Sequence, residues 1–125
     1  MKEQGTTPRV TPPQAWDTFI SGNERFVQGT SNHPNQDVDR RTELVNTQTP
    51  DVALFGCSDS RLAAEIIFDV GLGDLFIARN MGHVVAESIT ASMEYAVAEL
   101  GSALIVVLAH DSCGAVSEPQ PLTRH

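Results

Sequence analysis

Three side chains able to bind a transition metal lie at two points of the sequence. His110 and Cys113 form a His-x-x-Cys motif, and Cys57 lies in the middle of the chain. Thiolate and imidazole are ligands that zinc prefers, and three protein ligands with an open fourth position are typical of catalytic zinc sites. A disulfide, or a buried structural role for Cys57, is the alternative. The N-terminus shows no secretory signal, which favours a metal or catalytic role.

A carboxylate and a guanidinium follow Cys57 closely. Asp59 and Arg61 are two residues apart, so in an extended turn both side chains can lie on one side, where Arg61 keeps the carboxylate ionised and oriented. A weak surface ion pair is the alternative. Arg61 and Arg79 are the only Lys or Arg residues between residues 42 and 123, so we expect each to serve a particular carboxylate or anion.

The elements that would position these residues alternate between helices and strands. Thr11-Pro12-Pro13-Gln14 is a capping box with proline at the first helical position, which predicts a helix that ends near Gly29. The apolar pattern further predicts strands at residues 52–55, 75–78 and 104–108, and helices at 40–46, 62–69 and 86–100. Continuous apolar strands between helices indicate an α/β fold with a parallel β-sheet flanked by helices.

This topology predicts where the reactive residues meet. In an open parallel sheet, sites form beyond the carboxyl ends of the strands. The first strand leads into residues 57–61, the second into Arg79-Asn80, and the third into residues 110–113. We therefore expect these segments to meet at one edge of the sheet.

Composition excludes several classes of protein. The chain has 125 residues with 8 basic and 16 acidic side chains, giving a net charge of −8. An acidic chain is a poor partner for nucleic acid or an anionic membrane. No apolar run has the roughly 18 residues that a membrane span needs. Together with the missing signal, this predicts a cytoplasmic protein.

Four segments carry a family resemblance: Cys57-Ser58-Asp59-Ser60-Arg61, Arg79-Asn80, Ser92-Met93-Glu94-Tyr95-Ala96-Val97 and His110-Asp111-Ser112-Cys113-Gly114. In this order they resemble the β-class carbonic anhydrases, over about residues 16–116. The resemblance implies a β-carbonic anhydrase-like fold, a Zn²⁺ cofactor, and reversible hydration of carbon dioxide to bicarbonate and a proton.

The resemblance also implies roles for the site residues. Cys57, His110 and Cys113 would be the zinc ligands, and Asp59 with Arg61 the catalytic dyad. Asp59 could also leave Arg61 and become the fourth zinc ligand, which would close the site. We therefore expect an activity that rises with pH.

Residues for the substrate pocket are implied in the same way. Gln48, Phe76 and Tyr95 match pocket positions, some contributed across a dimer interface, so a homodimer or higher homo-oligomer is expected. Packing in the core is an equal alternative for Phe76. Arg79 matches an arginine of a non-catalytic bicarbonate site in some members. Leu54 replaces the tryptophan of that site, so we do not expect that form of regulation.

The C-terminal end departs from the family, whose members continue into further helices and a last strand. Residues 114–116 would begin the next helix of the family, but Pro119 and Pro121 follow closely and are poor helix formers. We expect a flexible arm at residues 1–10, the domain at 11–116 and an irregular tail at 117–125. The fold would be incomplete at its C-terminus, with apolar surface exposed at the third strand.

Three functions are consistent with these patterns. The first is zinc-dependent hydration of carbon dioxide, and the second is a truncated fragment that binds zinc, is catalytically inactive and acts by pairing with a full-length relative. A nucleotide-binding α/β module is the third. It is disfavoured because Gly71-Leu72-Gly73 precedes a strand, so no helix N-terminus follows it to bind phosphate.

Overall fold

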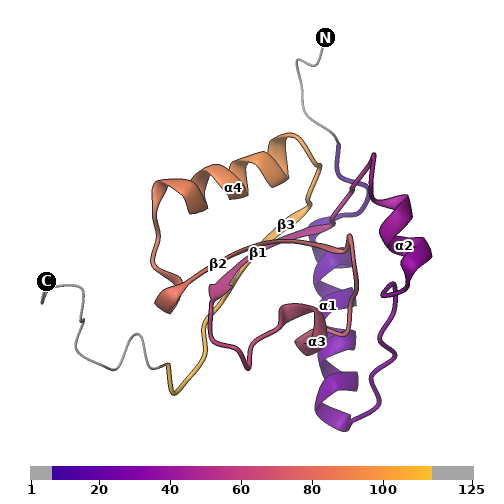
Figure 1. Ribbon diagram of the computed structural model, residues 1–125, viewed down its shortest axis with the longest axis horizontal. Helices are drawn as coiled ribbons and strands as arrows, with labels where there is room; N and C mark the ends of the chain where they lie inside the picture. Colours follow the sequence, from indigo (N-terminus) through magenta and orange to yellow (C-terminus); the bar gives the residue numbers. More distant parts are fainter. Residues whose placement is uncertain (1–6, 114–125) are drawn as a thin grey trace, which may run out of the picture.

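The computed structural model describes residues 7–113 and contains one parallel sheet (Figure 1). The strands are β1 (Val52–Cys57), β2 (Leu75–Asn80) and β3 (Leu104–Leu108), in the order β2-β1-β3. The predicted fold class is confirmed. The first two strands end two residues later than predicted, because Gly56 and Cys57 continue the pairing with Arg79 and Asn80.

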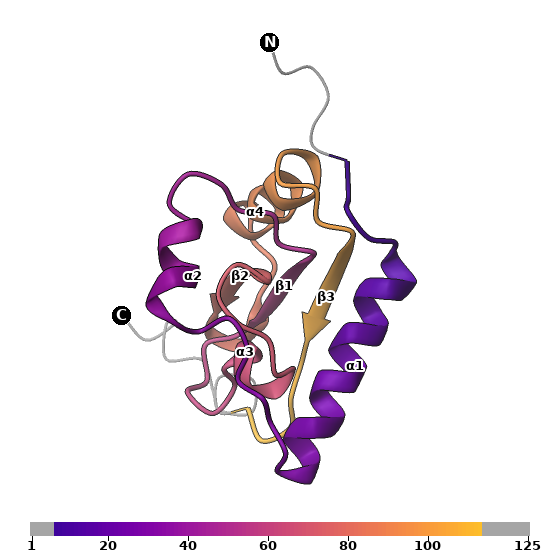
Figure 2. The same cartoon turned by 90° about the vertical axis from the view of Figure 1, so that its right-hand side faces the viewer.

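Helices cover both faces of the sheet. In order they are α1 (Pro12–Gln28), α2 (Val38–Glu43), α3 (Ala64–Ile67) and α4 (Glu87–Ala98), with a short 3-10 helix, η1 (Met81–His83), after β2. α4 lies on one face, and α1 and α3 lie on the other (Figure 1). Figure 2 shows α1 running alongside β3, with α2 on the opposite side of the molecule.

The central strand β1 supplies side chains to both halves of the core. Val52 and Leu54 pack with residues of α1 and α3, whereas Ala53 and Phe55 pack with residues of α4. All six residues of β1 are buried. Since side chains alternate between the faces of a strand, burial of the whole of β1 requires a helical layer on each side.

The first helix forms as its sequence predicts. The Thr11 hydroxyl accepts a hydrogen bond from Gln14 N, and the Gln14 side chain accepts one from Thr11 N, so the capping box is present. Gly29 ends the helix with a φ of 74°. Where α1 meets the chain after α3, a Cβ on Gly22 would lie 1.8 Å from the Phe68 carbonyl oxygen, so only glycine fits.

Three predicted helices have different bounds in the structure, and of these α4 changes least, at Glu87–Ala98 instead of 86–100. α2 begins at Val38 rather than residue 40, because the Asp37 side chain caps it by accepting a hydrogen bond from Arg40 N. α3 has four residues instead of the predicted eight. On one side Leu62 N donates to the Asp59 carbonyl in a turn, and on the other Asp69 has a φ of 49°, which ends the helix.

Asp69 is a buried carboxylate that the sequence reading did not single out. It is 2% exposed, and its oxygens accept hydrogen bonds from Arg25 Nε at 2.6 Å and from the backbone N–H groups of Asn32 and His33, each at 2.9 Å. The Asn32 N–H, together with Arg25 and the His33 N–H, lowers the pKa of Asp69 to about 2. This carboxylate joins the end of α1 and the following loop to the turn after α3.

The outer strand β3 exposes apolar side chains. Ile105 is 47% exposed and Val107 is 63% exposed, on the side where α4 covers β1 and β2. The expected apolar surface at the third strand is therefore present in the described part of the chain. None of the helices in that part is long and apolar enough to cross a membrane.

Part of the predicted N-terminal arm lies within the described residues. Within the predicted arm, an Arg9 guanidinium nitrogen (Nη2) donates to Asp51 Oδ1 at 3.0 Å, and Val10 packs against the core. Residues 1–6, the predicted helix start at 114–116 and the predicted tail at 117–125 lie outside the described residues.

Candidate metal centre

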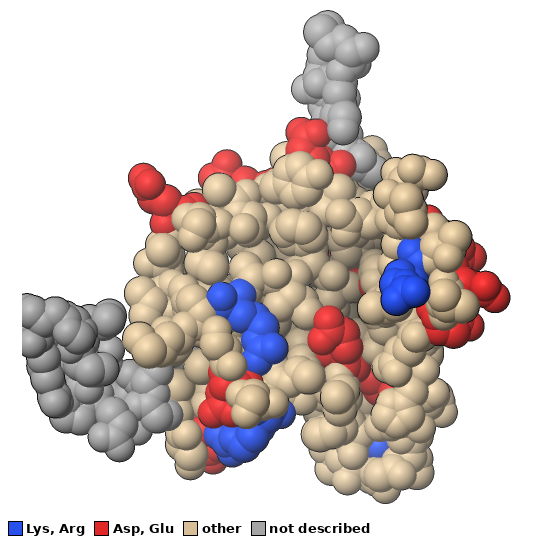
Figure 3. Space-filling view, viewed as in Figure 1, with Lys and Arg blue, Asp and Glu red and all other residues tan. Residues whose placement is uncertain are grey.

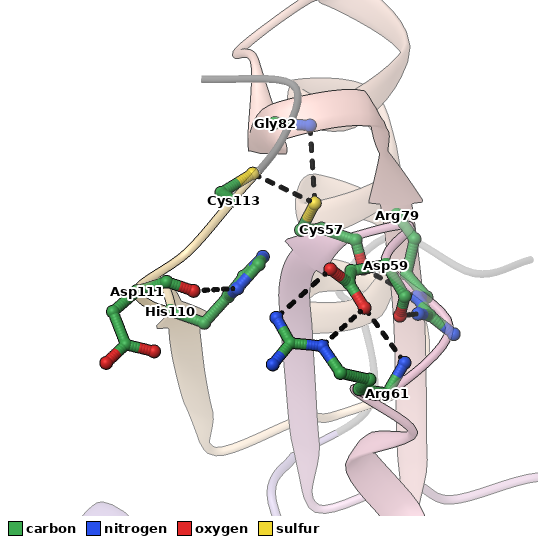
Figure 4. A network of polar contacts seen from close by, with 8 residues as sticks. All are labelled: Cys57, Asp59, Arg61, Arg79, Gly82, His110, Asp111 and Cys113. Atoms are coloured by element: carbon green, nitrogen blue, oxygen red, sulfur yellow. Dashed lines mark hydrogen bonds and ion pairs between the residues drawn. The ribbon is translucent and has the colours of Figure 1, made fainter. Parts of the chain in front are cut away.

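Three potential ligands meet beyond the carboxyl ends of β1 and β3. Cys57 is the last residue of β1, and His110 and Cys113 follow β3. Their ligand atoms all lie within 4.8 Å of one another, and the two sulfur atoms are 3.7 Å apart (Figure 4). The structure thus brings together the three residues that the sequence predicts as ligands.

The donor set fits zinc. Two thiolates at about 2.3 Å from a tetrahedral zinc ion are about 3.8 Å apart, close to the separation of these sulfurs. His110 Nδ1 lies 2.8 Å from the Asp111 carbonyl oxygen, which can only accept, so Nδ1 carries the proton and Nε2 has a free lone pair. His110 Nε2 is buried and has no hydrogen-bond partner within residues 7–113. A metal ion would satisfy it.

The surroundings of Cys57 favour its thiolate. The nearby His110 imidazole, followed by the backbone of Asp59 and of Gly82, lowers the pKa of the Cys57 thiol to about 6. The same thiolate raises the pKa of His110. His110 Nε2 forms no hydrogen bond within the described chain. The effect of His110 and Cys57 on each other's pKa therefore comes from their proximity. The thiolate is the form that binds metals.

Gly82 is a member of this site that the sequence reading missed. It lies in η1 with a φ of 70°, and its N–H points at Cys57 Sγ, 3.4 Å away. A residue with a side chain rarely adopts this φ, so glycine allows the N–H to reach the sulfur. The available signal was a glycine two residues after Asn80 at a strand end.

Asp59 and Arg61 form the predicted pair. Asp59 Oδ1 accepts hydrogen bonds from Arg61 N at 2.9 Å and Arg61 Nε at 3.2 Å, and Oδ2 accepts one from Arg61 Nη2 at 3.3 Å. These contacts, led by the guanidinium, hold the pKa of Asp59 below its usual value. In the structure Asp59 is paired with Arg61 and does not belong to the three-residue ligand group.

Arg79 binds carbonyl oxygens instead of a carboxylate. Its Nε donates to the Cys57 carbonyl at 2.9 Å, and its Nη2 donates to the Asp59 carbonyl at 2.7 Å. Ser58 N donates to the Asn80 carbonyl at 2.8 Å. Within the described residues Arg79 is therefore not paired with a carboxylate, and a role in binding an anion stays a prediction. The end of β2 instead holds Cys57 at the end of β1 and the loop that carries Asp59.

Leu54 stands where the bicarbonate site of some family members has tryptophan, according to the sequence resemblance. In the structure Leu54 is 1% exposed and belongs to the core on the α1 side of the sheet. This side chain packs against other apolar groups.

The predicted pocket residues gather at the other end of the sheet. Phe76 pairs with Ala53, four residues before Cys57, which places it about 13 Å from the metal centre along the strands. Its ring centroid is 5.8 Å from that of Tyr95, and Gln48 and Tyr95 line a cavity of about 280 Å³. Phe76 also packs in the α4 side of the core. Within one chain these residues do not reach the metal centre.

Charge is unevenly distributed around the site. Figure 3 shows acidic side chains at the upper edge, over α4, and at the right, where α2 lies. On the loop that follows β1, arginine and acidic side chains lie next to one another. Arg61 is paired with Asp59 on this loop, so both signs of charge lie close to the metal centre.

The fold and the site together define a parallel α/β domain with a Cys-His-Cys cluster that could hold a metal ion, and a carboxylate–guanidinium pair lies beside this cluster. Comparison with protein families agrees with this class. Residues 52–123 match the family described as carbonic anhydrase. The chain belongs to the carbonic anhydrase family, in its β class.

Individual relatives give the extent of the similarity. Carbonic anhydrase 2 of Mycobacterium tuberculosis is 54% identical over 110 residues, which are 88% of this chain and 53% of the relative. Carbonic anhydrase of Mycolicibacterium smegmatis is 52% identical over 109 residues, or 87% of this chain and 53% of the relative. The chain thus spans about half the length of these curated relatives.

Solved structures show the same fold. A tetrameric β-carbonic anhydrase of Sordaria macrospora superposes with a TM-score of 0.58 at 29% identity, covering 86% of this chain and 56% of that one. The β-carbonic anhydrase of Aspergillus fumigatus gives 0.58 at 29% identity, with 79% and 48% covered.

Proposed function

We propose that this chain holds a zinc ion through Cys57, His110 and Cys113 and catalyses the reversible hydration of carbon dioxide to bicarbonate and a proton. The observation that carries the proposal is the group of three ligand atoms within 4.8 Å of one another, next to the ion pair of Asp59 and Arg61. Membership of the carbonic anhydrase family supports the same reaction.

The chain's own residues have distinct tasks in this proposal. When bound, zinc supplies the Lewis acidity that makes water a nucleophile near neutral pH. Asp59 stays ionised because Arg61 lowers its pKa, and it accepts a hydrogen bond that orients the nucleophile toward the carbon of carbon dioxide. Arg61 fixes the carboxylate through its two side-chain contacts. Release of Asp59 from Arg61 would let the carboxylate bind the metal and close the site.

The substrate pocket would be completed by a second copy of the chain. Gln48, Phe76 and Tyr95 lie at the opposite end of the strands from the metal centre of their own chain. In a homodimer or higher homo-oligomer, the second copy brings them to the site. Phe76 and Tyr95 then offer an apolar surface to an uncharged gas, and Gln48 donates a hydrogen bond to an oxygen of the substrate.

One observation favours a second candidate, a zinc-binding chain without catalytic activity. The predicted pocket residues do not reach the metal centre of their own chain.

Stopped-flow hydration of carbon dioxide by the zinc-loaded chain, with zinc content and mass in solution measured on the same sample, separates the two. Hydration above the buffer rate that is lost in Asp59→Ala at full zinc content supports the enzyme. Stoichiometric zinc with no rate above buffer, in a sample that contains dimers, supports the inactive chain.

A further inference from the structure

We propose that Cys57 and Cys113 form an intramolecular disulfide when the chain without metal meets a hydroperoxide. These are the two cysteines of the sequence, and in the structure both are thiols that are not joined to one another. Both are buried, at 4% and 6% exposure, and their sulfur atoms face each other at 3.7 Å (Figure 4).

The geometry requires only a small approach. A disulfide bond is about 2.05 Å long, so the sulfur atoms must move together by about 1.7 Å. Cys57 is held at the end of the central strand β1 by pairing with β2. Cys113 follows β3 in a segment without helix or strand, after Ser112 with a φ of 54°. The movement therefore falls on Cys113, where no strand pairing opposes it.

The two sulfurs have different roles in the reaction. Cys57 Sγ accepts a hydrogen bond from Gly82 N, which stabilises negative charge on that sulfur, so Cys57 is the attacking thiolate. It attacks one oxygen of hydrogen peroxide, the O–O bond breaks, and Cys57 sulfenic acid and hydroxide form. The Cys113 sulfur then attacks the sulfenic sulfur, so that the S–S bond forms and the S–O bond breaks, and the leaving hydroxide takes up the Cys113 thiol proton to give water. The two sulfurs lose two electrons in total, and the peroxide gains them.

The disulfide and the metal exclude each other. Both sulfurs belong to the group of three ligand atoms, and a sulfur in a disulfide is no longer a thiolate ligand. Bound zinc should therefore protect both cysteines from oxidation. Disulfide formation should occur only as the metal is lost. The inference rests on the same sulfurs as the proposed function, but it does not require catalysis.

The test uses the full chain in two states, zinc-loaded and treated with a chelator, each exposed to hydrogen peroxide. Thiols are then blocked with an alkylating reagent, and the intact mass is measured. In the chelated chain we expect a loss of about 2 Da with no alkylation, reversed by a reductant. The zinc-loaded chain should lose thiols roughly tenfold more slowly, with zinc appearing on a chromophoric chelator in step with thiol loss.

Three outcomes would overturn the proposal: a chelated chain that keeps both thiols, one that gains about 32 Da as sulfinic acid, or one that forms only covalent dimers. Circular dichroism of the chelated chain verifies that it stays folded. In Cys113→Ser the sulfenic acid should be trapped on Cys57 by dimedone. Cys57→Ser should react more slowly, and equal rates would refute the assignment of Cys57 as the attacking thiol.

The result is separable from the proposed enzyme activity. Asp59→Ala should lose hydration and keep disulfide formation. Failure of hydration with an intact disulfide reaction would reject the enzyme alone, whereas normal hydration with no disulfide would reject this inference alone.

Discussion

Replacing Arg61 by alanine tests whether the ion pair with Asp59 positions the carboxylate for catalysis. In the wild type Asp59 receives three hydrogen bonds from Arg61, two of them from the guanidinium. Alanine keeps the backbone N–H at 2.9 Å from Oδ1 and removes both side-chain donors. Oδ2 then loses its donor from Arg61, and the carboxylate can rotate about its remaining contact.

The expected loss of activity in Arg61→Ala comes from a change in the orientation of the Asp59 carboxylate. Without the guanidinium the pKa of Asp59 rises toward its usual 3.8, which is still well below an assay range of about pH 7 to 9, so the carboxylate stays charged. The loss therefore comes from position, for which a displacement of about 1 Å costs roughly 100-fold. We expect Arg61→Ala to lower kcat about 100-fold. Arg61→Lys, which keeps a charge but lacks the paired donors, should retain an intermediate rate.

Stopped-flow hydration measured beside zinc content provides the assay. Arg41→Ala, at an exposed position of α2, is the matched control and should keep the wild-type rate. An Arg61→Ala protein that binds zinc fully and hydrates within threefold of the wild type would refute the reasoning. A loss of rate that only mirrors a loss of zinc would refute it as well.

Three further results are expected. The pKa of Asp69 is about 2 in the folded chain, below its usual 3.8, so its ionised form stabilises the fold above about pH 4, and this stability is lost as pH falls toward 2. In Asp69→Asn the urea midpoint should be lower at pH 7 and change less between pH 5 and 2, and an unchanged acid slope would contradict this. Gly22→Ala places a Cβ 1.8 Å from a backbone oxygen and should lower the free energy of unfolding by about 3 kcal/mol in urea titrations, whereas Ser21→Ala should not. Arg79→Gln removes donors to the loop after β1 and should weaken zinc binding about tenfold in chelator competition. An unchanged affinity would show that Arg79 does not position that loop.

Local patterns predicted much of the fold. The capping box at Thr11, the glycine that ends α1 and the three apolar strands depend on neighbouring residues, so they can be recognised in one sequence. The short helices were less predictable. α3 is shortened by the turn at Asp59 and by the left-handed backbone of Asp69, and that backbone is held by partners distant in the sequence.

The candidate site likewise has some features that the sequence predicts and others that depend on tertiary contacts. The types and order of Cys57, His110 and Cys113, and the spacing of Asp59 and Arg61, are features of the sequence, and they predicted which groups meet. The N–H of Gly82 at the sulfur and the Arg79 contacts to backbone carbonyls depend on how the end of β2 lies beside the loop after β1. Such contacts leave no periodic pattern in the sequence, so they could not be predicted from it.

The sequence by itself determined the candidate ligands and the alternation of strands and helices, because both are expressed in residue types over short distances. Only the tertiary structure decided the strand order β2-β1-β3 and how far apart the two sulfurs lie. It also decided that Phe76 and Tyr95 lie at the other end of the sheet from Cys57. The physical reason is that parallel pairing sets a common register for strands joined by long connections, and this register is a property of the packed sheet.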